Sequence, residues 1–549
     1  MRFRTWMSSV IVSSLATVPM PAESKSVPAV PHLERRGNAT QLIVDGKPFL
    51  ALAGELHNNS ATSLEYMKPV WPRLAAMHLN TVLAAVSWAM LEPAEGRFDY
   101  TLVDGLIRDA RAHQLRVVLL WFGSWKNTWS SYAPDWVKRD FERFPRVQLR
   151  NGSGTERLTP FSDRNRDADA RAFAALMRHI REVDGEAHTV IMIQVENEVG
   201  VIPDARDYSA QASAAYGQPV AKELMDYLLK HTHAIHPQLR ARWQAAGFKT
   251  SGTWETVFGA GLETEDLFMA WHYARYIGKV AEAGKAEYAL PMFVNAALIR
   301  PSYIPGQYNS GGPLPHSMDI WKAAAPHIDF LAPDIYFEFK HWCAEYDRSD
   351  NPLFIPEAAG GAAGAANVFY AVGQHGALGY APFGIDGAEG DDVAISRSYD
   401  VLSQLAPLIL QHQPQGRVAG VLFEDLTLAQ KVRLGDYTLH VSGGGALQPV
   451  SGTPVMSRAP SGQAPHGIFI AAGPDEFYAA GSGLTVTFSP NSPGPPLVGL
   501  ATVEEGGFVD GRWHRGRTLA GDDTGQGNNI SLPSGRGSQI LRMTLYRYR

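Results

Sequence analysis

The chain has 549 residues, of which 45% are hydrophobic and 19% are charged, and its formal net charge is -6. A chain of this length can bury more than one hydrophobic core, so we expect at least two domains. Its charges form no basic stripe, which argues against nucleic acid as a partner. The single cysteine, Cys343, excludes an intrachain disulfide and a zinc site made of clustered cysteines.

The N-terminal segment has the composition of a secretory signal. Residues 1–22 combine two arginines, an apolar stretch of signal-peptide length and a run of small residues and proline. We therefore predict a signal peptide over 1–22, a linker over 23–38 and a periplasmic or secreted protein. The apolar stretch is too short to cross a bilayer, and we expect no membrane span elsewhere.

Eight short apolar runs follow along the chain. A hairpin with an Asp-Gly turn at Asp45 and Gly46 leads into the first run. The runs begin at residues 49, 81, 117, 190, 291, 330, 352 and 377, and amphipathic helices are expected between them, for example over 65–78, 101–113 and 168–183. Continuous apolar strands separated by helices indicate a parallel sheet covered on both faces. Eight such units predict a (β/α)₈ barrel over residues 39–415.

The character of the sequence changes after the last expected helix, which should end near His412. From there apolar and polar residues alternate, and glycine, serine and proline punctuate the segments. Such alternation is typical of antiparallel strands with one solvated face. We therefore predict an α/β barrel followed by a smaller all-β, sandwich-like accessory domain over residues 416–549.

Polar and aromatic residues gather where the expected barrel strands end, and in such barrels this end carries the chemistry. In strand order they are Glu55 and His57; Trp88 and Glu92; Trp125, Lys126 and Asn127; Glu196, Asn197 and Glu198; Asn295; Asp334 and Tyr336; and Glu357. No phosphate loop, nucleotide fingerprint or serine elbow accompanies them. An acid-rich, aromatic-lined mouth suits cleavage of glycosidic bonds, which needs a proton donor and a facing carboxylate.

Two segments carry a family resemblance. LNTVLAAVSWAMLEPAEGRFDY (79–100) and QVENEVG (194–200) resemble glycoside hydrolase family 35, the β-galactosidases, in the clan of barrel hydrolases with catalytic acids on strands four and seven. The resemblance implies that Glu198 is the general acid/base, Glu357 the nucleophile and Asn197 the amide that binds the sugar 2-hydroxyl. It also implies that Tyr336 donates a hydrogen bond to the nucleophile.

The residues alone leave several roles open. Glu196 and Glu198 share one face of a regular strand, so periodicity does not say which acid is catalytic; the resemblance selects Glu198, and Glu196 would orient a neighbour or tune its pKa. Trp88 is expected in the pocket wall, with a buried barrel tryptophan as the alternative. Glu92 is expected to hold its own loop. The further substrate-binding residues that we expect are Trp125, Asn127, Glu55 and His57.

The sequence departs from the family pattern after strand three. Ser124 stands where family members carry an acid that contacts the sugar, and Lys126 and Asn127 are candidates to replace it. The segment GELHNNS after the first strand also differs from the family pattern.

The sequence thus predicts a retaining, exo-acting β-galactosidase that uses two glutamates and no cofactor or metal. Its partner would be a carbohydrate, such as the galactosyl side chains of plant polysaccharides. One alternative is another retaining β-glycosidase of the clan, a β-glucosidase, β-mannosidase or endo-glucanase. A second is a carbohydrate-binding or scaffold protein that kept the barrel without turnover. The sequence leaves a homo-oligomer open.

Overall fold

The computed structural model of the protein describes residues 1, 29–387, 392–424, 429–443, 463–535 and 539–549. The expected signal peptide and part of the expected linker lie outside the described residues. Among the described residues, no helix combines the length and the apolar character needed to cross a bilayer.

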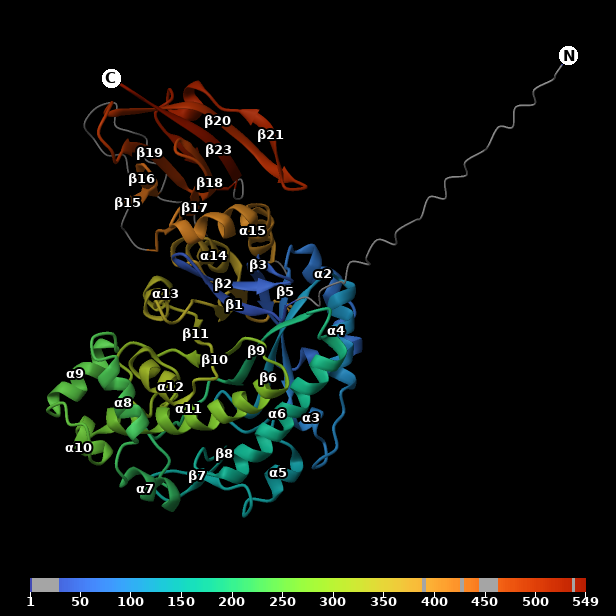
Figure 1. Ribbon diagram of the computed structural model, residues 1–549, viewed down its shortest axis with the longest axis vertical. Coiled ribbons are helices and arrows are strands. Elements are labelled where there is room, and N and C mark those ends of the chain that lie inside the picture. Colours follow the sequence, from blue (N-terminus) through green and yellow to red (C-terminus); the bar gives the residue numbers. More distant parts are fainter. Residues whose placement is uncertain (2–28, 388–391, 425–428, 444–462, 536–538) are drawn as a thin grey trace.

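Eight parallel strands close into a barrel, which confirms the predicted (β/α)₈ fold (Figure 1). In chain order they are β4 (Ala51–Glu55), β5 (Thr81–Ser87), β6 (Arg116–Lys126), β9 (Val190–Asn197), β10 (Met292–Ala297), β11 (Phe330–Ile335), β12 (Ile355–Ala358) and β13 (Gly379–Pro382). Each strand lies within or overlaps one of the eight apolar runs. The barrel closes where β13 pairs with β4, through Gly379 opposite Ala51.

The strands read as continuous apolar runs because both of their faces are buried. All eight residues of β9 are buried, as are all six of β11. The barrel interior holds its own cluster of apolar side chains, in which Phe293 stacks on Phe330 with ring centroids 5.2 Å apart. A larger cluster packs the outer face of the strands against the helices. Burial on two sides removes the alternation that marks a half-exposed strand.

Helices surround the barrel and occupy its long connections. They are α1 (Leu64–Met67), α2 (Val70–Ala76), α3 (Trp88–Leu91), α4 (Thr101–Ala112), α5 (Asp135–Arg139), α6 (Asp163–Asp184), α7 (Ala210–Tyr216), α8 (Lys222–Lys230), α9 (Pro237–Ala245), α10 (Trp254–Phe258), α11 (Leu262–Glu287), α12 (Met318–Ala324), α13 (Phe339–Tyr346), α14 (Gly361–His375) and α15 (Asp392–His412). The helix expected over 65–78 is divided into α1 and α2 near Pro69. Proline lacks the N–H that a continuous helix would need there.

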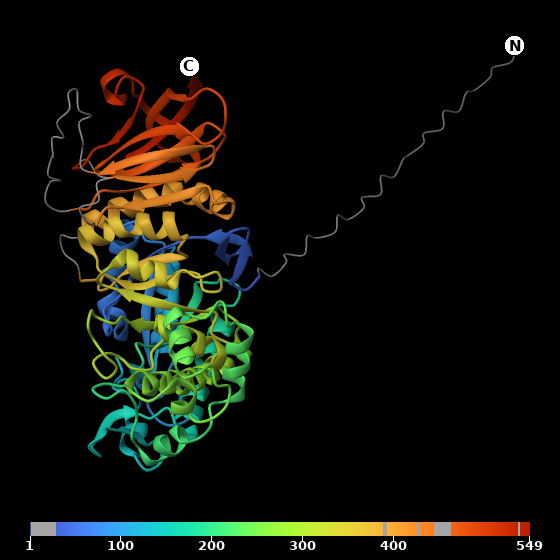
Figure 2. The ribbon, with the colours of Figure 1, turned by 90° about the vertical axis from the view of Figure 1, so that its left-hand side faces the viewer.

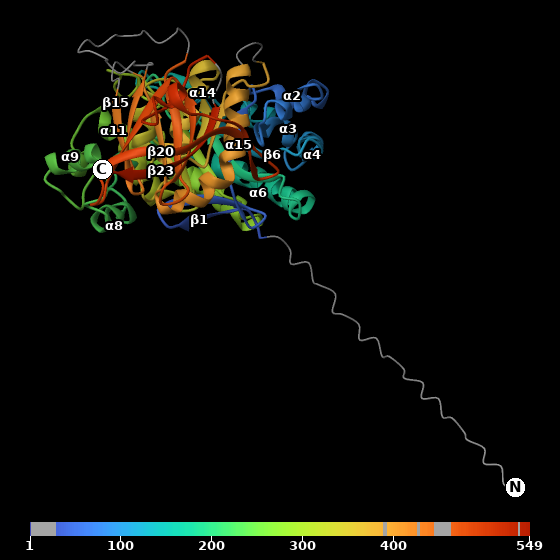
Figure 3. The same cartoon turned by 90° about the horizontal axis from the view of Figure 1, so that it is seen from above.

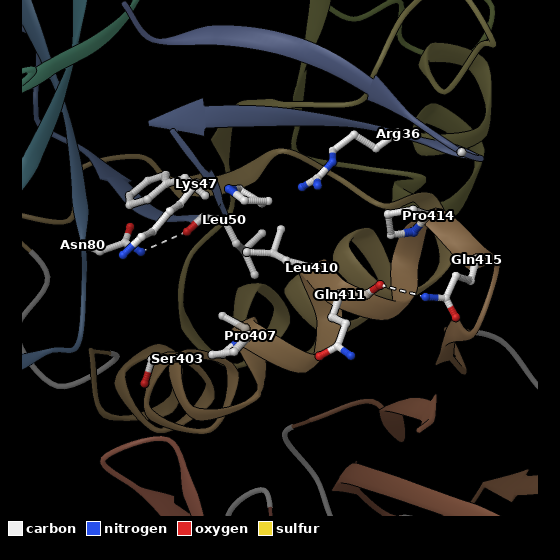
Figure 4. A pocket seen from close by; sticks show the side chains of 14 residues that line it. Arg36, Lys47, Leu50, Asn80, Ser403, Pro407, Leu410, Gln411, Pro414 and Gln415 are labelled. Carbon is white, nitrogen blue, oxygen red and sulfur yellow. Dashed lines mark hydrogen bonds between the residues drawn. The ribbon is translucent and has the colours of Figure 1, made fainter. Parts of the chain in front are cut away.

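A small antiparallel sheet precedes the barrel and lies beside α15. It comprises β1 (His32–Arg36), β2 (Ala39–Val44) and β3 (Lys47–Phe49). The predicted turn joins β2 to β3, and both of its residues have positive φ, 51° at Asp45 and 72° at Gly46. This is the turn geometry that matches the twist of a hairpin. A cavity of about 760 Å³ between this sheet and α15 is lined in part by Lys47, Leu410 and Pro414 (Figure 4).

The C-terminal region is all β, as predicted, and consists of two antiparallel sheets (Figure 2). The larger sheet has the order β14 (Val418–Leu422), β17 (His466–Ala471), β18 (Glu476–Ser482), β23 (Gln539–Tyr548), β20 (Leu497–Val509) and β21 (Arg512–Thr518). The smaller sheet has the order β15 (Ala429–Leu434), β16 (Tyr437–Gly443), β19 (Leu484–Pro490) and β22 (Ile530–Leu532). The apolar side chains between the two sheets form a separate core cluster.

The C-terminal domain packs on the barrel through α14 and α15, which Figure 3 shows beneath β20 and β23. The glycine- and alanine-rich sequence of α14 permits this close approach: a Cβ atom on Gly373 would lie 2.8 Å from Cα of Gly420. The long connections that follow β6 and β9 lie at the opposite end of the molecule (Figure 1). They include β7 (Arg146–Gln148) and β8 (Gly154–Leu158). The ends of β6 and β9 are therefore bordered by barrel connections.

Candidate active site

Three carboxyl groups meet at the carboxyl end of the barrel. Glu198 follows β9, Asp334 lies on β11 and Glu357 lies on β12. One oxygen atom from each group lies within 4.8 Å of the others, and all three residues are buried. Asp334 and Glu357 are direct partners in the pairing of β11 with β12. The barrel thus brings together two residues, Glu198 and Glu357, that lie far apart in the sequence.

The end of β9 departs from regular strand geometry. Glu196 and Glu198 have φ values of 63° and 45°, which are uncommon for residues other than glycine. As a result, Glu196 and Glu198 contact different residues. Glu196 accepts hydrogen bonds from the backbone N–H groups of Ser124 and Trp125 on β6, whereas the N–H of Glu198 donates to Oδ1 of Asn295 on β10 (3.0 Å). Of these two acids, Glu198 and not Glu196 joins the carboxyl cluster.

Asn295 links the fourth, fifth and sixth strands of the barrel. Its Oδ1 accepts the hydrogen bond from the backbone of Glu198, and its Nδ2 donates to Oδ2 of Asp334 (2.7 Å). Both Asn295 and Asp334 are buried. Burial first, and then the negative charges of Glu357 and Glu198, raise the pKa of Asp334 well above its usual range. The network fixes Glu198 in position relative to the sixth strand.

Tyr336 contacts the acid at the end of the seventh strand. Its hydroxyl group donates a hydrogen bond of 2.6 Å to Oε1 of Glu357. The tyrosine is 47% exposed, so it stands at the rim of the mouth and not in the core. The other carboxylate oxygen of Glu357, Oε2, is buried and has no hydrogen-bond partner among the described residues. One oxygen of Glu357 is therefore oriented while the other is unpartnered.

The environment of Glu198 favours its protonated form. Burial and, next, the negative charge of Glu357 raise the pKa of Glu198 to about 7, while the positive charge of Lys126 lowers it. When a buried carboxyl group beside a second carboxylate ionises, it loses hydration and is repelled by its neighbour, and both effects disfavour the charged form. Glu198 is thus suited to hold a proton near neutral pH beside an ionisable neighbour.

Lys126 is a buried cation at the end of β6. It is 6% exposed, and its ammonium nitrogen lies 5.3 Å from the centre of the Phe122 ring. Its Cα pairs with Asn197, the residue that precedes Glu198. Its charge lowers the pKa of both Glu55 and Glu198. Lys126 therefore acts electrostatically on two of the acids at the mouth.

Glu55 and His57, the two residues expected after the first strand, lie near this end of the barrel. Glu55 is buried; burial and then the charge of Glu357 raise its pKa well above the usual range. Its Oε1 has no hydrogen-bond partner among the described residues. His57 has a half-exposed side chain. Its backbone N–H donates to Oδ1 of Asp386 (2.8 Å), and its Nδ1 lies 3.1 Å from the same oxygen.

Asp386 was not predicted from the sequence. It follows the eighth strand, its carboxylate is buried, and besides His57 it accepts a hydrogen bond of 2.6 Å from Ser60. Its position in the sequence could have indicated a strand-end residue, because the apolar run at 377 predicts the eighth strand and Asp386 is the first acid after that run. Asn295 and Asp334 were recognised as strand-end residues, but their hydrogen bond to each other joins two strands and has no signature in sequence spacing.

Trp88 and Trp125 were expected to bind substrate, and that role stays a prediction. Both side chains are fully buried. The indole N–H of Trp88 donates to Oε2 of Glu92 (2.8 Å), so this pair stabilises the loop after β5. Trp125 lies within β6, which continues to Lys126, and its indole N–H donates to the carbonyl of Leu158 (3.0 Å). The strand is longer than its apolar run, and the ring of Trp125 packs edge-on against Tyr273 and Tyr276 of α11.

Asn197 and Asn127 lie beside the carboxyl cluster but differ in exposure. Asn197 is fully buried, and neither its Oδ1 nor its Nδ2 has a hydrogen-bond partner among the described residues. Buried amides are normally paired, so an unpaired one next to Glu198 is available to a ligand. Asn127 is exposed, has a φ of 49°, and its N–H donates to the carbonyl of Asn197 (3.2 Å).

Ser124 and Glu196 belong to a buried network behind the mouth. The Ser124 hydroxyl donates to Oδ2 of Asp169 (2.6 Å) and lies 2.7 Å from the hydroxyl of Tyr276. Burial and then the charge of Asp169 raise the pKa of Glu196 well above the usual range. Ser124, which stands at the position of the sugar-contacting acid of the family pattern, is fully buried. Of the two candidates for that role, Lys126 is the one whose charge reaches Glu198.

Comparisons with known proteins agree with a glycosidase. Residues 65–257 match the β-galactosidase family model Glyco_hydro_42, and residues 395–531 match a domain of unknown function, DUF5597. A β-galactosidase of Xanthomonas manihotis is 28% identical over 217 residues, which cover 39% of this chain and 33% of that relative. The aligned segment thus spans only a third of the relative's length.

Two solved structures are also similar to this chain. The β-galactosidase of Bacillus circulans is 13% identical, with a TM-score of 0.45, and the match covers 66% of this chain and 57% of that one. The β-galactosidase of the haloarchaeon Halorubrum lacusprofundi is 14% identical, with a TM-score of 0.44 and coverage of 65% and 58%. From the family match and the Xanthomonas relative, we conclude that the barrel carries a glycoside hydrolase domain similar to the β-galactosidases of family 42.

Proposed function

We propose that the protein is a retaining, exo-acting β-galactosidase in which Glu198 is the general acid/base and Glu357 the nucleophile. The observation that carries the proposal is the proximity of their carboxyl oxygens, within 4.8 Å. Retaining glycosidases hold their two carboxyl groups about 5–5.5 Å apart, whereas inverting enzymes need about 6.5–9.5 Å to admit a water molecule. The short separation supports direct attack by a carboxylate.

In the first step, a carboxylate oxygen of Glu357 attacks the anomeric carbon and forms a glycosyl ester. The bond from that carbon to the leaving oxygen breaks, and Glu198 gives its proton to this oxygen. The hydrogen bond from Tyr336 to Oε1 of Glu357 orients the carboxylate for the attack. Because the pKa of Glu198 is raised to about 7, its carboxyl group holds a proton near neutral pH and can donate it.

In the second step, a water molecule takes the place of the departed group. Glu198, now ionised, removes a proton from this water as its oxygen attacks the anomeric carbon. The ester bond to Glu357 breaks, and the sugar leaves with its original anomeric configuration. Glu198 ends protonated and Glu357 ends ionised, so the enzyme returns to its starting state.

Sugar recognition would fall to residues that lie next to the two acids. We assign Asn197 to the 2-hydroxyl because its buried amide has no partner among the described residues. Glu55 and Lys126 are suited to bind further hydroxyl groups, since the charge of Lys126 lowers the pKa of Glu198 and the charge of Glu198 raises the pKa of Glu55. An interaction with the 2-hydroxyl that strengthens in the transition state would raise the rate and not only the affinity.

The preference for galactose rests on two similarities. The family 35 resemblance of residues 79–100 and 194–200 and the family 42 match of residues 65–257 both name β-galactosidases. The assignment to family 35 itself stays a prediction, because the matched family model is that of family 42. The exo mode of action and an origin of the substrate in plant-polysaccharide side chains belong to the same proposal.

The second candidate function is another retaining β-glycosidase, a β-glucosidase, β-mannosidase or endo-glucanase. It is favoured by one observation, the burial of Ser124 at the position where family 35 members carry a sugar-contacting acid. A changed contact with the sugar would change the substrate while leaving Glu198 and Glu357 in place.

Aryl glycosides separate the two candidates. Hydrolysis of aryl β-D-galactoside should exceed that of the matching β-glucoside, β-mannoside, β-xyloside and α-L-arabinoside, and should vanish in Glu357→Gln. Preferential turnover of a different sugar would support the second candidate. Turnover of galactoside that survives in Glu357→Gln would contradict the nucleophile assignment.

We also propose that the protein is exported to the periplasm or the medium, from the composition of residues 1–22. Mass spectrometry of the protein purified from each cell fraction would identify its mature N-terminus. An uncleaved protein confined to the cytoplasm would contradict export.

A further inference from the structure

Trp129 is an exposed aromatic residue in the connection that follows the third barrel strand. It is 47% exposed, in contrast to the fully buried Trp88, Trp121 and Trp125. A single exposed aromatic side chain is common on a protein surface, so the surroundings of Trp129 decide whether it has a role. The mechanism proposed above makes no use of Trp129.

A tight turn fixes Trp129 next to Lys126. The N–H of Trp129 donates to the carbonyl of Lys126 (3.0 Å), and the N–H of Lys126 donates to the carbonyl of Trp129 (2.8 Å). The two residues between them, Asn127 and Thr128, have positive φ values of 49° and 70°. Residues other than glycine rarely adopt this conformation, and it persists where the surrounding structure enforces it.

One face of the Trp129 ring is covered by a cation. The guanidinium carbon of Arg157 lies over the ring, 3.8 Å from its centre. Arg157 itself is 3% exposed, and its Nε donates to the hydroxyl of Thr128 (3.0 Å). The exposed area of the tryptophan therefore lies on its opposite face and its edge. A ring held rigidly from behind loses little conformational freedom when something stacks on its open face.

The turn is attached to β9, the strand that leads directly into the acid/base residue Glu198. Lys126 pairs with Asn197, and the N–H of Asn127 donates to the carbonyl of Asn197, the residue before Glu198. In a retaining mechanism the leaving group departs on the side of the acid, opposite the nucleophile. Trp129 is thus tied to β9 and not to β12, which carries Glu357.

We propose that Trp129 is a stacking platform for a sugar bound in the leaving-group position. This inference rests on the proposed function, since it needs Glu198 as the acid. The apolar face of a pyranose ring matches the open face of an indole, and the hydroxyl groups around its edge remain in contact with water.

The test compares substrates with and without a sugar on the leaving side. β-Galactosyl fluoride has a leaving group of one atom and cannot reach Trp129. The comparison substrates are disaccharides of galactose β-linked to glucose, xylose or galactose. Trp129→Ala should lower kcat/KM for the preferred disaccharide by about tenfold or more and leave turnover of the fluoride unchanged. Trp129→Phe keeps a ring and should retain part of the disaccharide activity.

The controls separate this inference from the proposed function. Tyr546→Ala removes an aromatic residue of similar exposure from β23 in the C-terminal domain and should change neither substrate. A wild-type enzyme that hydrolyses neither β-galactosyl fluoride nor any disaccharide would refute the proposed function. If the wild-type enzyme hydrolyses the fluoride but no disaccharide, or if Trp129→Ala affects both substrates equally or neither, the platform is refuted.

Discussion

The hydroxyl group of Tyr336 donates a hydrogen bond of 2.6 Å to Oε1 of Glu357. The two residues come from adjacent strands, since Tyr336 follows β11 and Glu357 lies on β12, and β11 pairs with β12 in parallel. The contact orients one oxygen of the proposed nucleophile and leaves Oε2 without a partner among the described residues.

Tyr336→Phe should lower kcat/KM because the proposed nucleophile loses its orienting donor. A hydrogen bond to a charged group contributes about 1.5–3 kcal/mol, which corresponds to a loss of roughly ten- to a hundredfold. Steady-state kinetics with aryl β-galactoside would measure it, and Tyr546→Phe in the C-terminal domain is the matched control. Equal kcat/KM for Tyr336→Phe and the wild type would show that the contact has no role in the reaction.

Glu198→Gln should discriminate between leaving groups. The amide cannot donate the proton that a poor leaving group needs, while an activated aryl oxide leaves with little help. We therefore expect a larger loss of kcat/KM for a disaccharide than for a dinitrophenyl galactoside. Glu196→Gln, in the buried network behind the mouth, should not discriminate between the two. Equal losses in Glu198→Gln would count against its role as the acid.

The pH profile should report the state of Glu198. Its pKa of about 7 places the alkaline limb of kcat/KM near neutral pH, because activity falls as the proton is lost. The charge of Lys126 lowers this pKa, so Lys126→Met should raise it and move the limb to higher pH. Lys230→Met at the exposed end of α8 is the control. A limb that stays in place, or moves to lower pH, would contradict the assignment.

The cluster of three carboxyl groups could alternatively bind a hard cation. Carboxylate oxygens are the ligands that calcium and magnesium prefer, and Glu198, Asp334 and Glu357 lie close enough together to share one ion. Because the proposed mechanism uses these groups as acid and nucleophile, we expect full activity after dialysis against EDTA. Loss of activity that added calcium or magnesium restores would replace the two-glutamate account with a metal-dependent one.

Glu196 should matter more to stability than to catalysis. Glu196→Ala would leave the N–H groups of Ser124 and Trp125 buried without their acceptor. Each unsatisfied donor costs about 1–3 kcal/mol, so the free energy of unfolding should fall by roughly 2–6 kcal/mol. Urea denaturation would measure the change, with Glu182→Ala on the exposed face of α6 as the control. Unchanged stability would show that the two donors find other partners.

The barrel could be predicted from the sequence because its strands are buried on both faces. The run that contains β9 is apolar without interruption, and the structure buries every residue of this strand. The same patterns do not give the side chains at the strand ends. Trp125 was expected to bind substrate, but spacing did not predict that β6 continues past the apolar run with an irregular register between Trp121 and Lys126, or that the side chain of Trp125 is fully buried.

The site was predictable only in part, and for a related reason. Alternation could not separate Glu196 from Glu198, because their difference arises from two left-handed residues that a regular strand lacks. Contacts between strands, such as Asn295 with Asp334 and His57 with Asp386, depend on the closure of the barrel. Such long-range pairs leave no trace in the spacing of a single sequence.

The measurement that tests the central claim most directly is the capture of the covalent intermediate. Incubation with an activated 2-deoxy-2-fluoro-β-galactoside should inactivate the enzyme, because the fluorine slows hydrolysis of the glycosyl ester more than its formation. Peptide mass spectrometry should then find the fluorosugar on Glu357. A label on another acid, such as Asp334 or Glu55, or full activity after incubation with a reagent that occupies the site, would contradict the account.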